Sequence, residues 1–420
     1  MRYDTVVVGA GLAGLTAALR LAEEGQRVLV LAKGVGATHV APGTIDVLGY
    51  TDGPVESPAQ ALPGFAAANS DHPYRRLSID LIRASLEWFK DRLGEHGYRG
   101  GLDENFLVPT AVGVAKPTVL VPQTTAAGDL RAGGRFVFIG LRGLKDFYPA
   151  YLAENLARAR LPSGASVSAR AVEVAAPLGG ERDVSSVGFA RRLEQPEFRD
   201  SLLLELEGRL DPGEIVGFPA VLGLRDAGTV WRELETRLGR PVFEVATLPP
   251  SVQGIRVFET LTGALRRQGG RVVLGTTAVA GESDGGRLAG LVAQTAGRPL
   301  TYRAHSFVLA SGGFASGGLR LESSGTAREA VLDLPLAGVP CPERARFEPG
   351  YFGEHAFAGV GLEVDEQLRP VGGDGATAYE NVHAAGATLA GAVPWREASG
   401  NGLSLATGYA AASAILERTS

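Results

Sequence analysis

Hydrophobic and polar positions at the start of the chain change from a strand pattern to a helical pattern within a few residues. Thr5–Val8 is a continuous apolar, β-branched run, which is typical of a strand buried on both faces of a parallel sheet. Between Leu12 and Ala22 the apolar residues recur at helical spacing, and Gly25 stands where a helix ends. A second apolar run, Val28–Leu31, follows. This pattern predicts a strand–helix–strand unit.

The turn between the first strand and the helix carries the spacing G-x-G-x-x-G at Gly9, Gly11 and Gly14. In a nucleotide-binding unit, the first glycine permits the tight turn and the second lets the backbone approach a phosphate. The third lets the helix pack closely against the strand. The phosphate binds to the free N–H groups at the helix N-terminus, where the helix dipole favours negative charge. The motif in this context predicts a nucleotide or flavin site.

The strand-to-glycine pattern returns near the end of the chain. Phe307–Ala310 runs into a glycine turn, and Asn381–Gly386 does the same ahead of an Ala-rich helix expected over 403–416. We expect both runs beside the first strand. Near the end of the chain we also expect a helix at 257–268 and strands at 271–274 and 288–293. Nearer its start, residues 51–69 are expected as a loop and 77–93 as a helix.

The middle of the chain reads as an insertion. It offers strand candidates at 112–115, 135–141 and 167–175, helix candidates at 148–159 and 230–238, and a charged segment at 180–200 expected to be exposed. We therefore predict an α/β fold with a Rossmann-like flavin-binding domain and a parallel central sheet, formed by residues 1–75 and 250–420. A second α+β lobe of residues 76–249 interrupts it.

The end of the second strand departs from the usual dinucleotide pattern. An Asp or Glu normally stands there to bind the adenosine ribose, whereas this chain has Ala32 followed by Lys33. The departure weakens the simple adenosine-ribose interpretation and leaves room for FMN. The loop that follows is rich in small residues, which let the backbone reach a flat ring, and Asp46 within it is a candidate partner for ring or ribityl groups.

Composition excludes several classes of protein. The 420 residues are 45% apolar with a net charge of −5, which offers no basic face for nucleic acid. No segment approaches the roughly 20 apolar residues of a membrane span. The chain enters its first strand without a signal peptide, so we expect a cytoplasmic location. The single cysteine, Cys341, excludes a self-contained iron–sulfur cluster or a multi-cysteine zinc site, and we expect no metal.

Several stretches taken together resemble one family. They are the opening glycine motif, the loop of residues 32–49, Thr247–Arg256, Leu309–Leu319, Leu368–Pro370 and the closing glycine-rich strand and helix. This combination resembles the B subunit of the anaerobic glycerol-3-phosphate dehydrogenase, nearly end to end. The opening motif, the Ala-Ser-Gly-Gly turn and the C-terminal helix are also similar to the wider fumarate-reductase-like flavoproteins.

The resemblance implies a flavin subunit described as FMN-dependent, so we expect FMN as the cofactor, with FAD as the alternative. Its implied partners are a catalytic FAD subunit and a Cys-rich, membrane-associated iron–sulfur subunit, through which this chain would lie on the inner face of the cytoplasmic membrane. The implied reaction oxidises the small phosphorylated polyol sn-glycerol 3-phosphate to dihydroxyacetone phosphate, with the electrons passing to a quinone. Two alternatives stay open: a stand-alone FAD-dependent oxidoreductase of another small substrate, and a non-catalytic flavin electron relay.

Taking a hydride from a secondary alcohol requires a base for the hydroxyl proton and cations for a phosphate. The candidates are His39, Arg256 and Arg369, for which a structural histidine and ordinary ion pairs are equally open. The predicted flavin contacts are Gly9, Gly11, Leu12, Ala13, Gly14, Ala32, Lys33, Gly34, Thr38, Gly43, Thr44, Asp46, Ala310, Ser311, Gly312, Gly386, Gly391, Gly400, Gly402 and Leu403.

Overall fold

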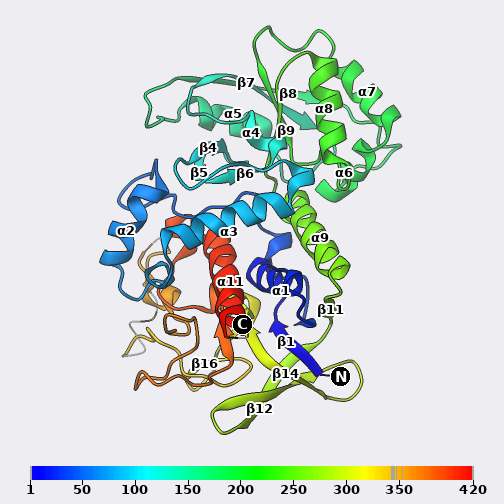
Figure 1. Cartoon of the computed structure of the whole chain (residues 1–420). Coiled ribbons are helices and arrows are strands. Elements are labelled where there is room, and N and C mark those ends of the chain that lie inside the picture. Colours follow the sequence, from blue (N-terminus) through cyan, green and yellow to red (C-terminus); the bar gives the residue numbers. More distant parts are fainter. Residues whose placement is uncertain (1, 342–345, 347, 352, 419–420) are drawn as a thin grey trace. The chain divides into compact units, whose positions relative to one another are not determined.

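The computed structural model describes residues 2–341, 346, 348–351 and 353–418 (Figure 1). The chain divides into two compact units. Unit 1 comprises Met1–Ala37, Ala59–Arg92 and Thr260–Ser420, and unit 2 comprises Thr38–Pro58 and Leu93–Glu259. No helix in the described ranges is long and apolar enough to cross a bilayer.

Unit 1 is built on one mixed sheet with the strand order β11-β2-β1-β14-β13-β12, and β17 also pairs with β14. The strands are β1 (Arg2–Val8), β2 (Val28–Ala32), β11 (Arg271–Leu274), β12 (Thr277–Asp284), β13 (Arg287–Gln294), β14 (Leu300–Leu309) and β17 (Val382–Ala384). The pairs β11–β2, β2–β1, β1–β14 and β14–β17 are parallel, whereas β12 and β13 form an antiparallel hairpin. The predicted parallel α/β sheet is confirmed, including both late runs in the sheet of the first strand.

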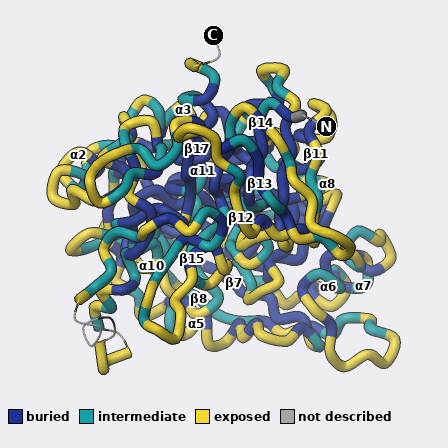
Figure 2. Tube along the Cα trace, turned by 90° about the horizontal axis from the view of Figure 1, so that it is seen from below, coloured by how far each residue is buried: buried dark blue, intermediate teal, exposed yellow. Residues whose placement is uncertain are grey.

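Two helices of unit 1 pack directly against each other. They are α1 (Leu12–Glu23) and α11 (Gly400–Glu417). A β-carbon on Gly408 of α11 would lie 2.3 Å from the carbonyl oxygen of Ala13, so the small residues of both helices are required for this close approach. Figure 2 shows α11 largely in the dark blue of buried residues. An Ala-rich helix suits this position because it can be buried on several sides without overpacking.

Unit 1 contains further helices and short strands. They are α2 (Pro58–Ala68), which begins one residue before the unit, η2 (Pro73–Arg76), α3 (Ile79–Arg92), η4 (Phe314–Ser316), β15 (Leu319–Leu321), β16 (Ala327–Glu329), η6 (Ala356–Gly359), η7 (Gly386–Thr388) and α10 (Pro394–Glu397).

Unit 2 contains a parallel sheet of its own, with the order β10-β9-β7-β8. Its strands are β7 (Gly134–Leu141), β8 (Val167–Val174), β9 (Ile215–Pro219) and β10 (Val242–Val245). The helices between them are α5 (Pro149–Ala157), α6 (Ser186–Leu193), α7 (Pro196–Leu206) and α8 (Ala227–Leu238). Phe136, Phe138 and Phe243 pack edge to face and in a stack within its core.

Smaller elements complete unit 2. They are η1 (Ala37–His39), which begins one residue before the unit, η3 (Gly94–His96), α4 (Gln123–Ala126) and two antiparallel ribbons, β3 (Arg99–Gly100) with β6 (Leu120–Val121) and β4 (Phe106–Pro109) with β5 (Ala115–Thr118). Helix α9 (Val252–Arg267) begins in unit 2 and continues into unit 1.

Several elements differ from the prediction. The expected loop at 51–69 contains the helix α2, because its alanines favour helix despite Pro63. The charged segment at 180–200 contains α6, whose buried Phe189 and Leu193 share one helical face. The strand expected at 112–115 forms instead at Ala115–Thr118, and Val112 is exposed in the preceding turn.

The two units also differ from the predicted domain boundaries. Residues 38–58 and 250–259, expected in the flavin-binding domain, cluster with unit 2, while α3, expected in the insertion, clusters with unit 1. The sheet of unit 2 is entirely parallel, so the insertion contains an α/β sheet together with the antiparallel ribbons.

Candidate functional site

The carboxyl ends of four parallel strands of unit 1 lie along one sheet edge. Val8 of β1 is in register with Leu31 of β2 and Leu309 of β14, and Leu309 is in register with Ala384 of β17. The loops that leave these strands therefore begin side by side. In open α/β sheets, ligands bind outside this edge.

The three glycines of the opening motif have different surroundings. Gly9 has φ +105°, and a β-carbon there would lie 2.1 Å from the carbonyl oxygen of Ala310. A β-carbon on Gly14 would lie 2.0 Å from the carbonyl oxygen of Gly9. For Gly11, by contrast, no described atom outside its chain neighbours lies within 4 Å of that position. Gly9 and Gly14 thus meet protein backbone, whereas Gly11 faces open space.

The N-terminus of α1 supplies hydrogen-bond donors to that space. Gly11 is the N-cap of α1 and, lacking a side chain, makes no capping hydrogen bond. The first N–H groups of an α-helix have no partner within the helix. An uncapped helix end beside a position free of side-chain atoms suits a phosphate group.

Two further glycines complete the surroundings of this helix end. A β-carbon on Gly36 would lie 2.8 Å from the backbone nitrogen of Gly11, so the segment after β2 folds against the motif. Gly386 has φ +77°, and a β-carbon there would lie 2.9 Å from that of Ala13. Gly36 was not among the predicted contacts, although its G-x-G spacing with Gly34 was visible in the sequence. Lys33 is exposed at the start of the same segment.

The C-terminal helix offers a second uncapped N-terminus. It begins at Gly400, one turn before the expected start at Leu403, so Gly400 and Gly402 lie in its first turn. Neither glycine's N–H group has a hydrogen-bond partner among the described residues. Thr407 holds this helix to the loop after β17, because its hydroxyl accepts the N–H of Gly386 at 2.9 Å and donates to Leu403 O at 2.6 Å.

Some buried hydroxyl groups near these loops lack partners. Ser311 Oγ, just after β14, and Thr388 Oγ1, just after β17, are buried without a hydrogen bond in the described part of the chain. An unpaired buried hydroxyl is costly, so such atoms point to a ligand or water. Together with the open space at Gly11, they show that the residues of this edge fit a flavin.

Gly391, also a predicted contact, packs closely against another loop. A β-carbon there would lie 2.2 Å from the carbonyl oxygen of Asp71. Packing within unit 1 therefore requires a glycine at this position, even without a ligand.

An apolar cavity of about 1250 Å³ adjoins the start of α11. Its lining includes Phe314 and Phe357, whose ring centroids are 4.6 Å apart, and Leu403. Tyr351 and Trp395 also line it and are 85% and 69% exposed. Large exposed aromatic side chains around an apolar hollow are typical of a surface that another molecule covers.

In unit 2, His39 lies in a partly buried position. Its ring meets Phe258 edge to face at 4.7 Å, and its Nε2 is buried without a hydrogen-bond partner among the described residues. Burial lowers the pKa of His39, and the nearby Glu259 opposes this only partly. The imidazole is therefore neutral at pH 7 and able to accept a proton. Thr38 Oγ1, beside it, is likewise buried and unpaired.

Arg256 is buried in unit 2 within a closed network. Its guanidinium bonds both carboxylate oxygens of Glu244, at 2.7 and 2.9 Å, and the carbonyl oxygen of Gly223. Burial raises the pKa of Glu244, but the charge and hydrogen bonds of Arg256, with those of Thr124 and Leu222, outweigh it and lower the pKa. The positive charge of Arg256 is thus compensated inside the protein.

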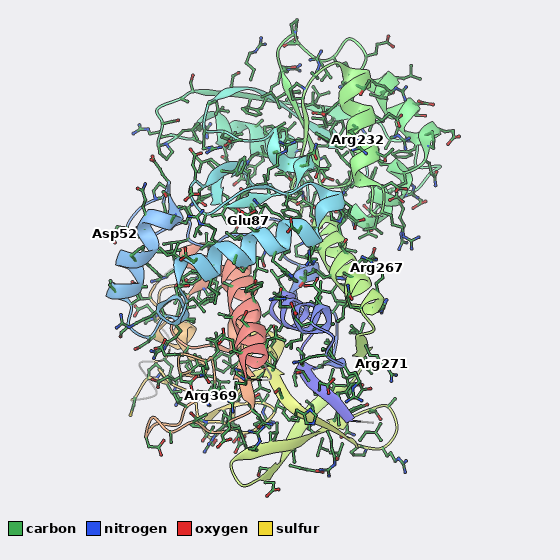
Figure 3. The ribbon with its side chains drawn as sticks, in the orientation of Figure 1. Asp52, Glu87, Arg232, Arg267, Arg271 and Arg369 are labelled. Carbon is green, nitrogen blue, oxygen red and sulfur yellow. The ribbon has the colours of Figure 1, made fainter. Side chains whose placement is uncertain are left out.

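The other predicted polar contacts are also paired. Asp46 binds Lys116 at 2.7 Å and accepts the Thr44 hydroxyl at 3.1 Å, both in unit 2. Gly43, in the same loop, accepts a hydrogen bond from the buried hydroxyl of Tyr98 at 2.5 Å. In unit 1, Arg369 (labelled in Figure 3) forms an ion pair with Asp365 at 2.7 Å. The described residues contain no cluster of His, Cys, Asp and Glu able to hold a metal ion.

Sequence comparisons identify the family. A family model described as an FAD binding domain matches residues 4–403. The probable B subunit of the anaerobic glycerol-3-phosphate dehydrogenase of Halobacterium salinarum is 35% identical over 99% of this chain and 98% of its own length. The B subunit of the anaerobic glycerol-3-phosphate dehydrogenase of Yersinia pestis is 32% identical, with coverage of 99% and 98%.

A solved quinol fumarate reductase of E. coli is 11% identical, with a TM-score of 0.46, and its alignment covers 100% of this chain and 70% of that chain. Together with the flavin-compatible edge of unit 1, the sequence matches over nearly the full length confirm the predicted resemblance. The chain therefore belongs to the FAD-binding domain family and, within it, to the family of B subunits of anaerobic glycerol-3-phosphate dehydrogenases, which are flavin-dependent oxidoreductases.

Proposed function

We propose that this chain is the flavin-binding subunit of an enzyme that oxidises sn-glycerol 3-phosphate to dihydroxyacetone phosphate and passes the electrons to a quinone through partner subunits. The observation that carries the proposal is the open, uncapped helix end at Gly11 in a chain that matches its glycerol-3-phosphate dehydrogenase relatives over nearly its full length. A bound flavin would supply the two-electron acceptor for this oxidation.

We propose FAD as that flavin, in place of the FMN expected from the sequence. The FAD-binding family model supports it, and FMN is the alternative that the Ala32–Lys33 ending of β2 keeps open. A chain without a carboxylate at this position lacks the usual contact to an adenosine ribose. The flavin contacts proposed within unit 1 are Gly9, Gly11, Leu12, Ala13, Gly14, Ala32, Lys33, Gly34, Ala310, Ser311, Gly312, Gly386, Gly391, Gly400, Gly402 and Leu403.

In unit 2, we propose Thr38, Gly43, Thr44 and Asp46 as further contacts and His39 as the base that accepts the hydroxyl proton. The support for His39 is its neutral imidazole with an unpaired Nε2. Arg256 and Arg369 remain the proposed cations for the phosphate. Each already binds a carboxylate, so we propose that they orient polar groups more than they supply free charge.

We propose that the partners are a catalytic FAD subunit and a Cys-rich iron–sulfur subunit, because the names of the relatives describe one subunit of a larger enzyme. The exposed Tyr351 and Trp395 at the apolar cavity favour a surface that a partner covers. Contact with the inner face of the cytoplasmic membrane would be indirect, through such a partner.

The experiment is to purify the chain alone and with the products of neighbouring genes, identify the released flavin by mass, and measure glycerol 3-phosphate oxidation. We expect FAD, and turnover with an artificial electron acceptor. The flavin-free chain with no turnover in any combination would contradict the proposal. The electron-relay alternative would be favoured by two results together. The isolated chain would bind flavin without turning over glycerol 3-phosphate, and the complex would still turn it over when His39 is replaced by alanine.

A further inference from the structure

The helix α11 begins with a serine that does not cap it. Ser399 is the N-cap residue, with φ −130° and ψ −11°, and its side chain makes no capping hydrogen bond. A serine at this position normally accepts an N–H group of the first helical turn. Here Ser399 Oγ instead donates to Glu397 Oε2 at 2.6 Å. The hydroxyl is therefore directed away from the helix end.

Glu397 is a buried carboxylate that holds this hydroxyl in place. Its Oε1 accepts the N–H of Val393 at 2.6 Å, and its Oε2 also binds His72 Nε2 at 3.2 Å. Burial raises the pKa of Glu397, but the hydrogen bonds from His72 and Ser399 outweigh burial, and the net pKa lies below its usual range. The group is ionised at neutral pH and accepts hydrogen bonds only, so Ser399 must act as the donor.

His72 anchors the carboxylate to a distant part of unit 1. Its Nδ1 accepts the N–H of Tyr74 at 3.1 Å, which leaves the ring proton of the neutral imidazole on Nε2, facing Glu397. The ring is buried and contacts the rings of Phe65 and Tyr74, at 5.0 and 4.8 Å. The histidine is thus fixed in both orientation and tautomer.

The consequence appears at the first turn of α11. The N–H groups of Gly400 and Gly402 have no partner among the described residues, and Gly402 is buried. Leaving a buried N–H unpaired when a serine hydroxyl is adjacent is unfavourable, unless another group uses that donor. A buried carboxylate, Glu397, and a buried histidine, His72, together keep the Ser399 hydroxyl away from this N–H group.

We propose that Glu397 and His72 are positioning residues that divert the Ser399 hydroxyl, so that the N–H group of Gly402, in the first turn of α11, stays available to the flavin. This inference rests on the proposed flavin site. The uncapped N–H groups would favour the reduced, more negative flavin, because a helix N-terminus carries partial positive charge. With the hydroxyl released, Ser399 would cap the helix and compete for the N–H group of Gly402, its third residue.

A purely structural role for the pair makes a different prediction. If Glu397 and His72 only hold the loop between α10 and α11, replacing them lowers stability. Ser399→Ala then changes the flavin midpoint potential by the same amount with or without Glu397. If the pair diverts the hydroxyl, the two substitutions are coupled: Ser399→Ala changes the flavin midpoint potential only after the acceptor Glu397 has been replaced.

The test is a double-mutant cycle on the flavin-loaded chain, using Glu397→Met, Ser399→Ala and the double variant. Methionine keeps the volume of glutamate but does not accept the serine hydroxyl well. The loss of the Glu397 charge itself also changes the midpoint potential. This direct effect is the same in the single Glu397→Met variant and in the double variant, so it cancels when the two are compared. We expect Ser399→Ala to leave the potential unchanged with Glu397 present, and to raise it in the Glu397→Met background.

A tenfold change in the ratio of affinities for reduced and oxidised flavin corresponds to about 30 mV for a two-electron couple. We expect a coupling of about three- to tenfold in this ratio. Glu397→Gln is the matched control, because it removes the charge but keeps an acceptor for Ser399. Ser399→Ala should have no effect in that background. If Glu397→Met does not accumulate as folded protein, Glu397→Ala replaces it in the same cycle.

Amide exchange of Gly402 in the full chain distinguishes the diversion of the Ser399 hydroxyl from its effect on the flavin. Slower exchange in Glu397→Met than in the double variant is expected, because the released hydroxyl caps the helix. If exchange does not change, the diversion itself is overturned. If exchange slows but the potentials show no coupling, the diversion serves no flavin, and the proposed place of α11 at the flavin fails with it.

Discussion

Gly14 lies so close to Gly9 that a β-carbon on Gly14 would sit 2.0 Å from the Gly9 carbonyl oxygen. This contact joins the first turn of α1 to the end of β1. It explains why the third glycine of the motif is required even without a ligand, whereas Gly11, in the same motif, has open space around it. The motif therefore combines a packing requirement with a binding requirement, and substitutions can separate the two.

Gly14→Ala is expected to destabilise the protein by about 3 kcal/mol, because the added methyl group meets backbone that cannot move freely. This loss should appear even though alanine favours helix over glycine. Gly11→Val should leave the unfolding midpoint of the flavin-free chain nearly unchanged and abolish flavin binding by filling the open space. Denaturant unfolding and flavin absorbance per chain measure the two effects. Full flavin occupancy in Gly11→Val would contradict the assignment of this space to the flavin phosphate.

Gly402→Asp is expected to lower the flavin midpoint potential. The substitution places a carboxylate in the first turn of α11, where it opposes the positive end of the helix dipole and repels the reduced flavin. Gly402→Asn is the control, because it has nearly the same shape without the charge. Potentiometric titration compares the two variants. Equal potentials in both, with flavin still bound, would show that this turn only begins the helix.

Glu244→Gln is expected to cost about 3–5 kcal/mol of stability, because it leaves the buried Arg256 charge without its carboxylate. The matched control is Glu154→Gln, which breaks the exposed pair with Arg158 at 2.5 Å and should leave the unfolding midpoint unchanged. Urea unfolding of both variants provides the measurement. If Glu244→Gln lowers the free energy of unfolding as little as the control does, Glu244 is not what compensates the charge of Arg256.

His383 is expected to make stability depend on pH. Burial is the main cause that lowers its pKa to about 4, so the folded chain resists protonation while the unfolded chain does not. Its contribution, at most about 3 kcal/mol, is present above pH about 6.5 and is lost as the pH falls toward 4. His383→Gln should flatten this part of the profile, whereas His305→Gln, at an exposed residue, should not. An unchanged slope in His383→Gln would exclude this histidine as the cause.

Local sequence determined much of the flavin-compatible edge. The change from strand to helical periodicity at Gly9–Leu12, and the apolar runs before Gly312 and Gly386, depend on neighbouring residues only, and the structure has each element in the predicted sheet. Burial on both faces explains this success, because a strand inside a parallel sheet must be apolar throughout. The family was equally visible from the motifs taken together.

Tertiary structure alone decided the contacts that join distant segments. His72 and Glu397 are 325 residues apart, and nothing in the surroundings of either residue in the sequence indicates the other. The structure also decided between the two roles left open for Arg256, since it pairs this guanidinium with the buried Glu244. The grouping of residues 38–58 with unit 2 likewise depends on long-range packing. Periodicity reports which face of an element is buried, whereas the partner on that face is selected by the fold as a whole.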